Sequence, residues 1–271
     1  MRQGCGRCND KNCSLVSCST LTRNYKQMKN SNNIDDLIPE NDEYCPCSSG
    51  KLFGVCCGAD NTQPPRGVVI KHNAIPAKKC NEIVAYLKNQ DKFWLTTYVK
   101  TNILGQTKSV NDPSRVAQWI KKGKWSKKID RIVQQGFTEI IKDRRNQTLL
   151  WYEDPTVLFY TAGGLYVPHV DCGNFNSTTG CWEKLIDRDY SILFYLSDDF
   201  EGGNIHFNLF KFSYKPKKGD MIFFPSDSRY IHTAEPVLSG NRYAIVSWCA
   251  IKESTKVNSV PPDKAVHVKD A

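Results

Sequence analysis

Residues 190–207, with the sequence YSILFYLSDDFEGGNIHF, contain two short apolar runs joined by a turn. The runs YSILFYL and NIHF are rich in aromatic and β-branched residues, which are typical of strands. The intervening DFEGG is predicted to be a turn, because its glycines permit tight backbone geometry. The same pattern continues from about residue 149 onward in TVLFY, LYVPHV, DMIFFP and RYAIVSW. This series of short strands predicts a sandwich or jelly roll.

Helical patterns precede the strand region. The stretch IPAKKCNEIVAYLKNQ, residues 75–90, places Ile83, Val84 and Leu87 at helical spacing, with Pro76 near its start. Residues 113–122 and 126–143 are also predicted to form helices. The Pro- and Gly-containing GADNTQPPRG resembles a linker, so we expect a domain boundary near residue 65. The main domain is then expected over residues 66–255, followed by a polar tail over 256–271.

The composition is that of an ordinary globular protein, with 40% hydrophobic and 24% charged residues among 271. The net charge of +9 favours acidic partners, but the basic residues are scattered, so charge alone does not predict nucleic-acid binding. No window is apolar enough to span a membrane, and the N-terminus lacks the apolar region of a secretory signal. We therefore expect a cytoplasmic protein whose twelve cysteines are thiols or metal ligands rather than disulfides.

Four polar residues in the strand region form a candidate metal site. A lone His169-x-Asp171 pair is common by chance, but His232 follows the strand DMIFFP and its loop, and Arg242 opens the strand RYAIVSW. Two imidazoles and one carboxylate can occupy one face of an octahedral metal and leave three positions open, which suits a non-haem Fe(II) oxygenase. Arg242 supplies a permanently charged fork for a carboxylate, which a lysine would orient less well.

With these residues in place, the sequence resembles the Fe(II)/2-oxoglutarate-dependent dioxygenases. Within that family it is most similar to prolyl 4-hydroxylases, especially the oxygen-sensing prolyl hydroxylase type. The likeness covers residues 155–250 well and residues 66–154 loosely. It rests on FYTAGGLYVPHVD, YSILFYLSDDFEGGNIHF, KPKKGDMIFFPSDSRYIHTAEPV and GNRYAIVSW, which follow the family's order and spacing.

The resemblance implies a role for each matching residue. It makes His169, Asp171 and His232 the iron ligands, and it pairs Arg242 with the distal carboxylate of 2-oxoglutarate. It also assigns three aromatic side chains to the site: Tyr195 at the same carboxylate, Tyr160 near the iron, and Trp248 in the substrate pocket. The implied reaction couples substrate hydroxylation to release of succinate and CO2, with Fe(II), 2-oxoglutarate, O2 and ascorbate as cofactors.

Several of these residues have a simpler interpretation. Tyr160, Tyr195 and Trp248 are large aromatics in strands, so core packing alone could explain each of them. His206 is expected to be a strand residue whose ring nitrogens are satisfied. The polar segment 172–189 is predicted to be a long loop that covers the substrate, because long loops beside a site often act as lids. Its Cys172 and Cys181 are expected to remain free thiols.

Eight of the twelve cysteines lie in the first 57 residues, in two clusters. The second cluster, CPCSSGKLFGVCCG, resembles the SEC-C motif, a small zinc-binding module. Within an expected module at residues 40–60, four thiolates suit tetrahedral Zn(II), namely Cys45, Cys47, Cys56 and Cys57. The first cluster lies in residues 1–20 and has the spacing of a zinc knuckle, with Cys5, Cys8, Cys13 and Cys18 as candidate ligands.

The first cluster departs from a zinc knuckle at Cys13, which stands where the knuckle has histidine. Knuckles bind single-stranded nucleic acid through stacking aromatics, and none lies between Cys5 and Cys18. Zinc is therefore favoured there over nucleic acid. For both clusters, a flexible cysteine-rich tail and a purely structural zinc clip remain alternatives.

Together these features predict a mainly β protein, a double-stranded β-helix (jelly roll) with flanking helices, preceded by one or two zinc modules. The predicted function is a peptidyl prolyl 4-hydroxylase acting on a protein or peptide, without a membrane partner. One alternative is hydroxylation of another residue, such as Lys or Asn, by the same machinery. The other is a catalytically dead adaptor that recruits a partner through its zinc modules.

Overall fold

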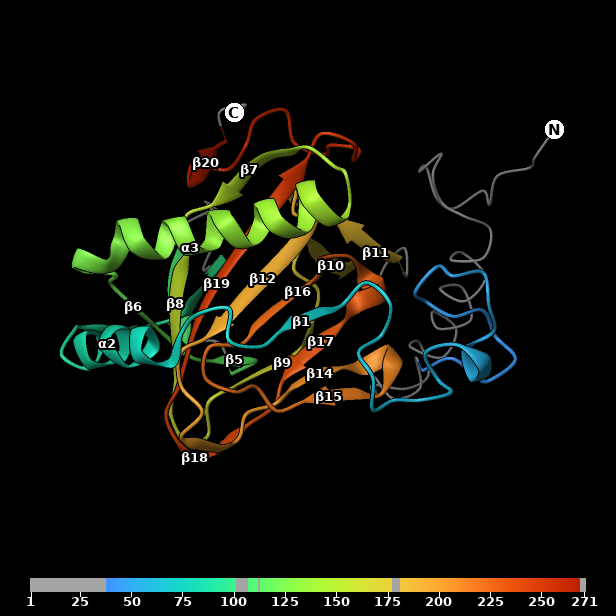
Figure 1. Ribbon diagram of the computed structural model, residues 1–271. Helices are drawn as coiled ribbons and strands as arrows, with labels where there is room; N and C mark the ends of the chain where they lie inside the picture. The colour runs from blue at the N-terminus through green and yellow to red at the C-terminus, as the bar shows by residue number, and fades with distance from the viewer. Residues whose placement is uncertain (1–37, 101–106, 112, 177–180, 269–271) are drawn as a thin grey trace.

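The computed structural model describes residues 38–100, 107–111, 113–176 and 181–268. Two antiparallel sheets face each other and form the predicted jelly roll (Figure 1). The larger sheet contains, in spatial order, β1 (Val69–Lys71), β16 (Met221–Pro225), β12 (Tyr190–Tyr195), β19 (Arg242–Ile251), β8 (Thr156–Tyr160), β6 (Gln118–Ile120) and β2 (Lys92–Trp94). At its side, β7 (Leu149–Glu153) pairs with β19, and β20 (Ala265–His267) pairs with β7. The predicted polar tail therefore contributes a strand.

The smaller sheet contains β15 (Phe212–Tyr214), β14 (Ile205–Phe207), β17 (His232–Ala234), β9 (Leu165–His169) and β5 (Arg115–Val116). Three further strand pairs are β3 (Thr96–Lys100) with β4 (Thr107–Asn111), β10 (Gly173–Asn176) with β11 (Cys181–Lys184), and β13 (Phe200–Gly202) with β18 (Val237–Gly240). The strand-like runs of the sequence are confirmed, since they form β8, β9, β12, β14, β16 and β19.

The central strands are apolar on both faces, because each face packs against a different layer. On β12, Ile192 and Phe194 join the core beneath the helices, whereas Tyr195 joins the core between the sheets. On β16, Phe223 faces the helices and Phe224 faces the other sheet. Alternate side chains of a strand point to opposite faces, so one continuous apolar run supplies both layers.

Two helices cover the outer face of the larger sheet (Figure 1). The first is α2 (Ala77–Leu87), and the second is α3 (Ser126–Thr138), which a π-helical segment, η4 (Glu139–Arg144), continues. These elements confirm the helices predicted over 75–90 and 126–143. The described part of the chain also contains short 3-10 helices, namely η2 (Phe53–Val55), η3 (Gly123–Trp125), η5 (Asn208–Phe210) and η6 (Ser228–Tyr230). None of the helices in the described ranges has the length and apolar character that crossing a membrane requires.

The helix predicted over residues 113–122 is wrong. This segment instead forms β5 and β6, which extend both sheets by pairing with β9 and β8. Val116, Trp119 and Ile120 have a spacing compatible with a helix. Pairing with β9 and β8 satisfies the backbone hydrogen-bonding groups of this segment and of those two strands. The spacing of apolar residues within the segment carries no information about these distant partners.

Candidate active site

The two histidines of the predicted metal site face each other on neighbouring strands. His169 ends β9 and His232 begins β17, and the antiparallel register pairs the two residues directly. The carboxylate oxygens of Asp171 lie 3.8 Å from His169 Nε2 and 3.6 Å from His232 Nε2. One ligand atom from each of the three residues lies within 4.8 Å of the others, so a single metal ion could contact all three.

Backbone carbonyls orient both imidazole rings. His169 Nδ1 lies 2.8 Å from the carbonyl oxygen of Val167, and His232 Nδ1 lies 3.1 Å from that of Tyr230. Because a carbonyl only accepts a hydrogen bond, each Nδ1 carries the proton and donates it. Each Nε2 is left with its lone pair directed toward Asp171, which is the tautomer that binds a metal.

Serine hydroxyls hold the Asp171 carboxylate in place. Ser191 Oγ donates to Asp171 Oδ2 over 2.6 Å, and Ser226 Oγ lies 2.7 Å from Ser191 Oγ behind it. Burial alone would raise the pKa of Asp171, but the two imidazoles and the Ser191 hydroxyl lower it to about 2. Burial and the neighbouring His232 lower the pKa of His169 to about 3. A neutral imidazole beside a carboxylate is the charge state that binds a cation.

Arg242 places an unbalanced positive charge at the other end of the same cavity. Its side chain is buried, and its guanidinium lies 3.9 Å from the ring centroid of Tyr160. Its Nη1 donates to the carbonyl oxygen of Gly203, whereas its Nε has no hydrogen-bond partner. A buried cation is costly unless an anion compensates it, so these donors suit an acidic ligand. Burial also raises the pKa of the nearby Tyr195 to about 12, so its hydroxyl remains a donor.

Comparison with known proteins agrees with this geometry. Residues 155–250 match the model of the 2OG-Fe(II) oxygenase superfamily. This segment of the chain is a 2OG-Fe(II) oxygenase domain. All four residues of the predicted site lie within it.

Individual relatives are similar over part of the chain. Human prolyl 3-hydroxylase 2 is 40% identical over 76 residues, which is 25% of this chain and 11% of that protein. Chicken prolyl 4-hydroxylase subunit alpha-1 is 31% identical over 137 residues, 48% of this chain and 27% of that protein. This chain thus spans well under half of either relative. A solved viral collagen prolyl hydroxylase from Paramecium Bursaria Chlorella virus-1 has a TM-score of 0.49 at 21% identity, covering 73% of this chain and 100% of that one.

The side chains of the oxygenase domain fit the cofactors that its family implies, namely Fe(II), 2-oxoglutarate and O2. Two imidazoles and one carboxylate are the donor set of an Fe(II) site that keeps open positions. The unpartnered Arg242 Nε fits a dicarboxylate co-substrate, because a guanidinium binds carboxylates through two parallel hydrogen bonds.

The three aromatic residues to which the resemblance assigns pocket roles lie together. Tyr160, Tyr195 and Trp248 line the same cavity as the metal-ligand candidates and Arg242. Their positions are consistent with pocket roles, although each also packs in the apolar cores of the oxygenase domain.

Two charged groups of the site were not predicted from the sequence. Arg188 binds both carboxylate oxygens of the buried Glu153, donates to the carbonyl oxygen of Asp171 over 3.1 Å, and lies 3.8 Å from the ring centroid of Trp248. This arrangement ties the backbone of Asp171 to the Trp248 side of the cavity. Glu153 belongs to β7, far from Arg188 in sequence, and no local pattern links them.

The sequence also gives no sign of Arg115, because the pattern of residues 113–122 predicts a helix rather than the strand β5. From β5 its guanidinium lies 4.8 Å from the Tyr166 ring, and that ring stacks on His169 with centroids 3.5 Å apart. Arg115 Nε is buried without a hydrogen-bond partner, and the side chain lines the cavity. The cavity is therefore lined by a second arginine, beside the Tyr166 ring that stacks on His169.

Two expectations near the site need correction. The segment predicted to be a long loop contains a hairpin in which β10 pairs with β11, and the rings of Phe175 and Trp182 meet across the pair with centroids 5.6 Å apart. The ring of His206 is not fully satisfied, since its buried Nδ1 has no hydrogen-bond partner. Strand β14 lies between β15 and β17, so its backbone groups are paired while the ring nitrogen is not. Cys172 is a free thiol, as expected, whereas the side chain of Cys181 lies outside the described part of the structure.

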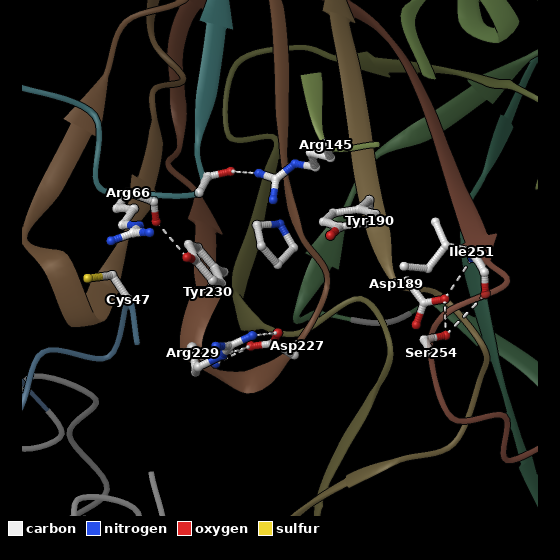
Figure 2. Close-up of a pocket in the computed structure, with 12 residues that line it drawn as sticks. Cys47, Arg66, Arg145, Asp189, Tyr190, Asp227, Arg229, Tyr230, Ile251 and Ser254 are labelled. Carbon is white, nitrogen blue, oxygen red and sulfur yellow. Dashed lines mark hydrogen bonds and ion pairs between the residues drawn. The ribbon is translucent and has the colours of Figure 1, made fainter. Parts of the chain in front are cut away.

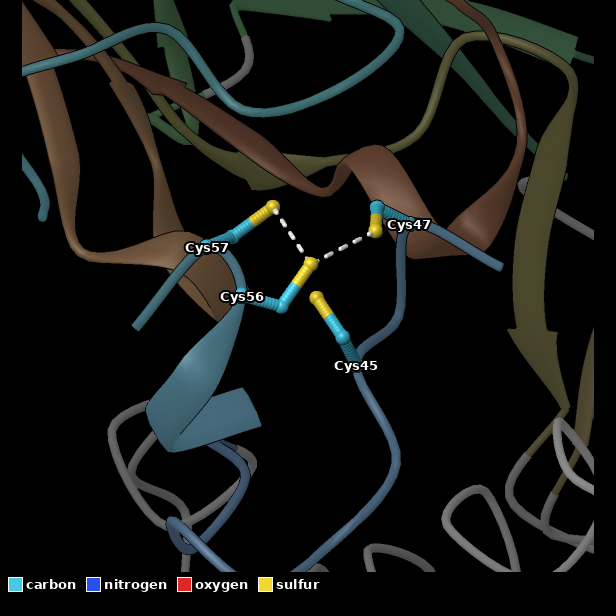
Figure 3. Close-up of side chains that lie close together, drawn as sticks. All are labelled: Cys45, Cys47, Cys56 and Cys57. Carbon is cyan, nitrogen blue, oxygen red and sulfur yellow. Dashed lines mark hydrogen bonds between the residues drawn. The ribbon is translucent and has the colours of Figure 1, made fainter. Parts of the chain in front are cut away.

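The second cysteine cluster forms a compact group of thiols (Figure 3). One sulfur from each of Cys45, Cys47, Cys56 and Cys57 lies within 4.8 Å of the others. Four sulfurs about 2.3 Å from a central zinc lie roughly 3.8 Å apart, so the arrangement fits tetrahedral Zn(II). A hydrogen bond from Cys57 lowers the pKa of Cys45 to about 5, and the same contact together with burial raises the pKa of Cys57. The first cluster, Cys5, Cys8, Cys13 and Cys18, lies outside the described residues.

Proposed function

We propose that this chain is a peptidyl prolyl 4-hydroxylase that uses Fe(II), 2-oxoglutarate and O2. The observation that carries the proposal is the placement of three metal-ligand atoms and one unbalanced buried arginine in a single cavity. The choice of proline is supported by the relatives, which are named prolyl hydroxylases from human and chicken.

In this proposal His169, Asp171 and His232 hold Fe(II), which supplies the activation of O2 when it is bound. The Val167 and Tyr230 carbonyls fix the ring tautomers, and Ser191 fixes the carboxylate. With both imidazoles neutral and the carboxylate ionised, the three ligands together carry one negative charge. The two positive charges of Fe(II) exceed this single negative charge. The bound metal then retains a positive charge that attracts an acidic co-substrate.

Arg242 and Tyr195 are proposed to hold the distal carboxylate of 2-oxoglutarate. Arg242 offers a planar fork of donors, and Tyr195 offers a neutral hydroxyl, because its pKa of about 12 keeps the proton in place. Tyr160 covers one face of the guanidinium, so it excludes water and strengthens the charge interaction.

A prolyl residue of a protein or peptide is proposed to enter beside Trp248. The Arg188 guanidinium packs against the Trp248 ring. An apolar ring of the substrate suits the aromatic wall formed by Trp248 and Tyr160. Zn(II) bound by Cys45, Cys47, Cys56 and Cys57, and ascorbate as an auxiliary reductant, belong to the same proposal. Cytoplasmic location, nucleic-acid binding through the first cysteine cluster, and the domain bounds remain predictions from the sequence.

The test is peptide-dependent turnover of 2-oxoglutarate. The full chain is supplied with Fe(II), ascorbate, O2 and proline-rich peptides, and succinate and peptide mass are followed. We expect the peptide to stimulate succinate formation and to gain one oxygen on proline. The Asp171→Ala variant should lose both signals, whereas the exposed Asp91→Ala control should retain them.

Other outcomes distinguish the alternatives. Oxygen on lysine or asparagine would keep the oxygenase and replace its substrate. Full biological activity of Asp171→Ala, together with no binding of Fe(II) or 2-oxoglutarate, would favour a catalytically dead adaptor.

A further inference from the structure

The second cysteine cluster is packed into the same core that surrounds His232. We call residues 38–58, which contain the four thiols, the cysteine module. Its Cys45, Cys47 and Phe53 are buried together with residues of both sheets, including Phe207 and Phe224. These two phenylalanine rings flank His232, with ring centroids 6.0 and 4.7 Å from the imidazole. The module and the candidate iron ligand thus share one apolar cluster.

A polar contact joins the cysteine module to the turn that precedes His232. Ser48, between the second and third cysteines of the cluster, accepts a hydrogen bond from Arg229 Nη1 over 2.6 Å. Arg229 also forms a two-point ion pair with Asp227, and Asp227 caps the backbone of the short helix η6 (Figure 2). The position of η6 is therefore tied to the module at one end.

A second contact joins the segment just after the module to the ring of Tyr230. The Tyr230 hydroxyl donates to the carbonyl oxygen of Arg66 over 2.6 Å (Figure 2). The backbone carbonyl of the same Tyr230 accepts the hydrogen bond from His232 Nδ1. Tyr230 therefore makes both contacts: its backbone carbonyl orients the His232 ring, and its side chain binds the segment that follows the cysteine module. Tyr230 is only 3% exposed, so this hydrogen bond is shielded from water.

The cysteine module has little regular structure of its own. Within its described residues it contains the short helix η2 and one isolated bridge, between Tyr44 and Leu52. Backbone hydrogen bonds such as Cys45 N to the carbonyl oxygen of Lys51 and Phe53 N to that of Glu43 fold the segment on itself. An ion bound by the four thiolates would add a link between its first and second pairs of cysteines. Loss of that ion would release Ser48 and loosen the packing beneath Phe207 and Phe224.

We propose that a cation in the Cys45–Cys57 cluster positions His232 for iron binding, through Ser48–Arg229 and Arg66–Tyr230. This inference rests on the proposed function, since it takes His232 as an iron ligand. Tyr230 and Arg229 are positioning residues in this scheme. The cluster therefore tunes the iron affinity of the oxygenase domain, and a chain that loses the cation binds Fe(II) more weakly.

The test compares Fe(II) affinity in full-length chains that differ in zinc content. Zinc is quantified by atomic emission, and Fe(II) is titrated anaerobically by calorimetry in the presence of 2-oxoglutarate. Cys56→Ser removes the sulfur that contacts both Cys47 Sγ and Cys57 Sγ. We expect it to lose zinc and to raise the Kd for Fe(II) about tenfold, the usual effect of disturbing the partners of a metal ligand. Tyr230→Phe should raise the Kd about tenfold while zinc is retained, because only the hydroxyl is lost.

Tyr152→Phe is the matched control. Tyr152 is equally buried and also loses one hydroxyl hydrogen bond, to Asp130, but lies in the core beneath α3. It should leave the Kd for Fe(II) within about twofold of the wild type. Equal Fe(II) affinity of zinc-loaded wild type, Cys56→Ser and Tyr230→Phe would overturn the coupling and leave the proposed function intact. Failure of the zinc-loaded wild type to bind Fe(II) would overturn both. If Cys56→Ser does not fold, Tyr230→Phe alone decides the outcome.

Discussion

Arg242 carries a buried charge that no acidic side chain of the described residues balances. We predict that Arg242→Lys raises the Kd for 2-oxoglutarate about tenfold or more in metal-loaded protein, measured by calorimetry. Lysine keeps the charge but lacks the fork, and one charge-assisted hydrogen bond is worth roughly 1.5–3 kcal/mol. The exposed Arg131→Lys on α3 serves as the control and should bind normally. An unchanged Kd in Arg242→Lys would show that the carboxylate binds elsewhere.

Ser191 is the residue through which the strand β12 supports Asp171. Ser191→Ala removes the donor to Asp171 Oδ2 and leaves the buried Ser226 hydroxyl without its partner. We expect the Kd for Fe(II) to rise about tenfold, because the carboxylate loses the group that orients it. Anaerobic titration with Fe(II) measures the change.

Ser197→Ala is the matched control for Ser191. Ser197 is equally buried and donates to the carbonyl oxygen of Asn241, away from the candidate metal ligands. Its loss should lower the free energy of unfolding without changing the Kd for Fe(II). Equal Fe(II) affinity of the two variants would mean that Asp171 does not need its serine.

At the scale of elements, Asp189 joins the start of β12 to the end of β19. Its carboxylate accepts from the backbone N–H of Ile251, from Ser254 Oγ, and from Lys184 Nζ. Burial would raise the pKa of Asp189, but these donors hold it below its ordinary value. The ionised form therefore stabilises the fold above about pH 4, and this contribution is lost as the pH falls through the lowered pKa.

We predict that Asp189→Asn lowers the free energy of unfolding by about 1–3 kcal/mol at pH 7, because the amide meets Lys184 and Ser254 as a donor. The difference from the wild type should shrink toward pH 3, where the wild-type carboxylate begins to take up a proton. Urea unfolding at both pH values measures it. The exposed Asp263→Asn should match the wild type at both. A difference that persists unchanged at low pH would show that the charge of Asp189 is not what stabilises the fold.

The elements also show how far the sequence could predict this molecule. Runs such as RYAIVSW were recognisable as strands because the double-sided core requires continuous apolar residues. His169, Asp171, His232 and Arg242 were recognisable because their spacing fits a known site. The sequence does not reveal the roles of Arg188, Glu153 and Arg115, because these depend on contacts between segments distant in sequence. For the same reason, the spacing of apolar residues within 113–122 predicts a helix, although β5 and β6 pair with strands of two sheets.

At the scale of the whole molecule, two clusters of candidate metal ligands lie beside one apolar core. The larger sheet presents Tyr195 and Phe224 to the space between the sheets, and the cysteine module closes one end of that space with Phe53. Because the core is shared, order in the module and order in the oxygenase domain should be lost together on heating.

We therefore predict that Zn(II) raises the Tm of the full chain, since binding to the folded form alone stabilises it by mass action. At a free Zn(II) concentration about a hundred times the Kd, the stabilisation is about 2.7 kcal/mol. Scanning calorimetry with and without Zn(II) gives the shift, and Cys56→Ser should abolish it.

Cys80→Ser is the matched control, because Cys80 is a buried thiol on α2 outside the cluster. Its Tm should fall, since a buried hydroxyl replaces the thiol, but the shift on adding Zn(II) should remain. A single transition that moves with Zn(II) would show that the module and the oxygenase domain unfold as one unit. A small zinc-dependent transition beside a larger, unmoved one would show that the module melts independently, so that the shared core does not couple them.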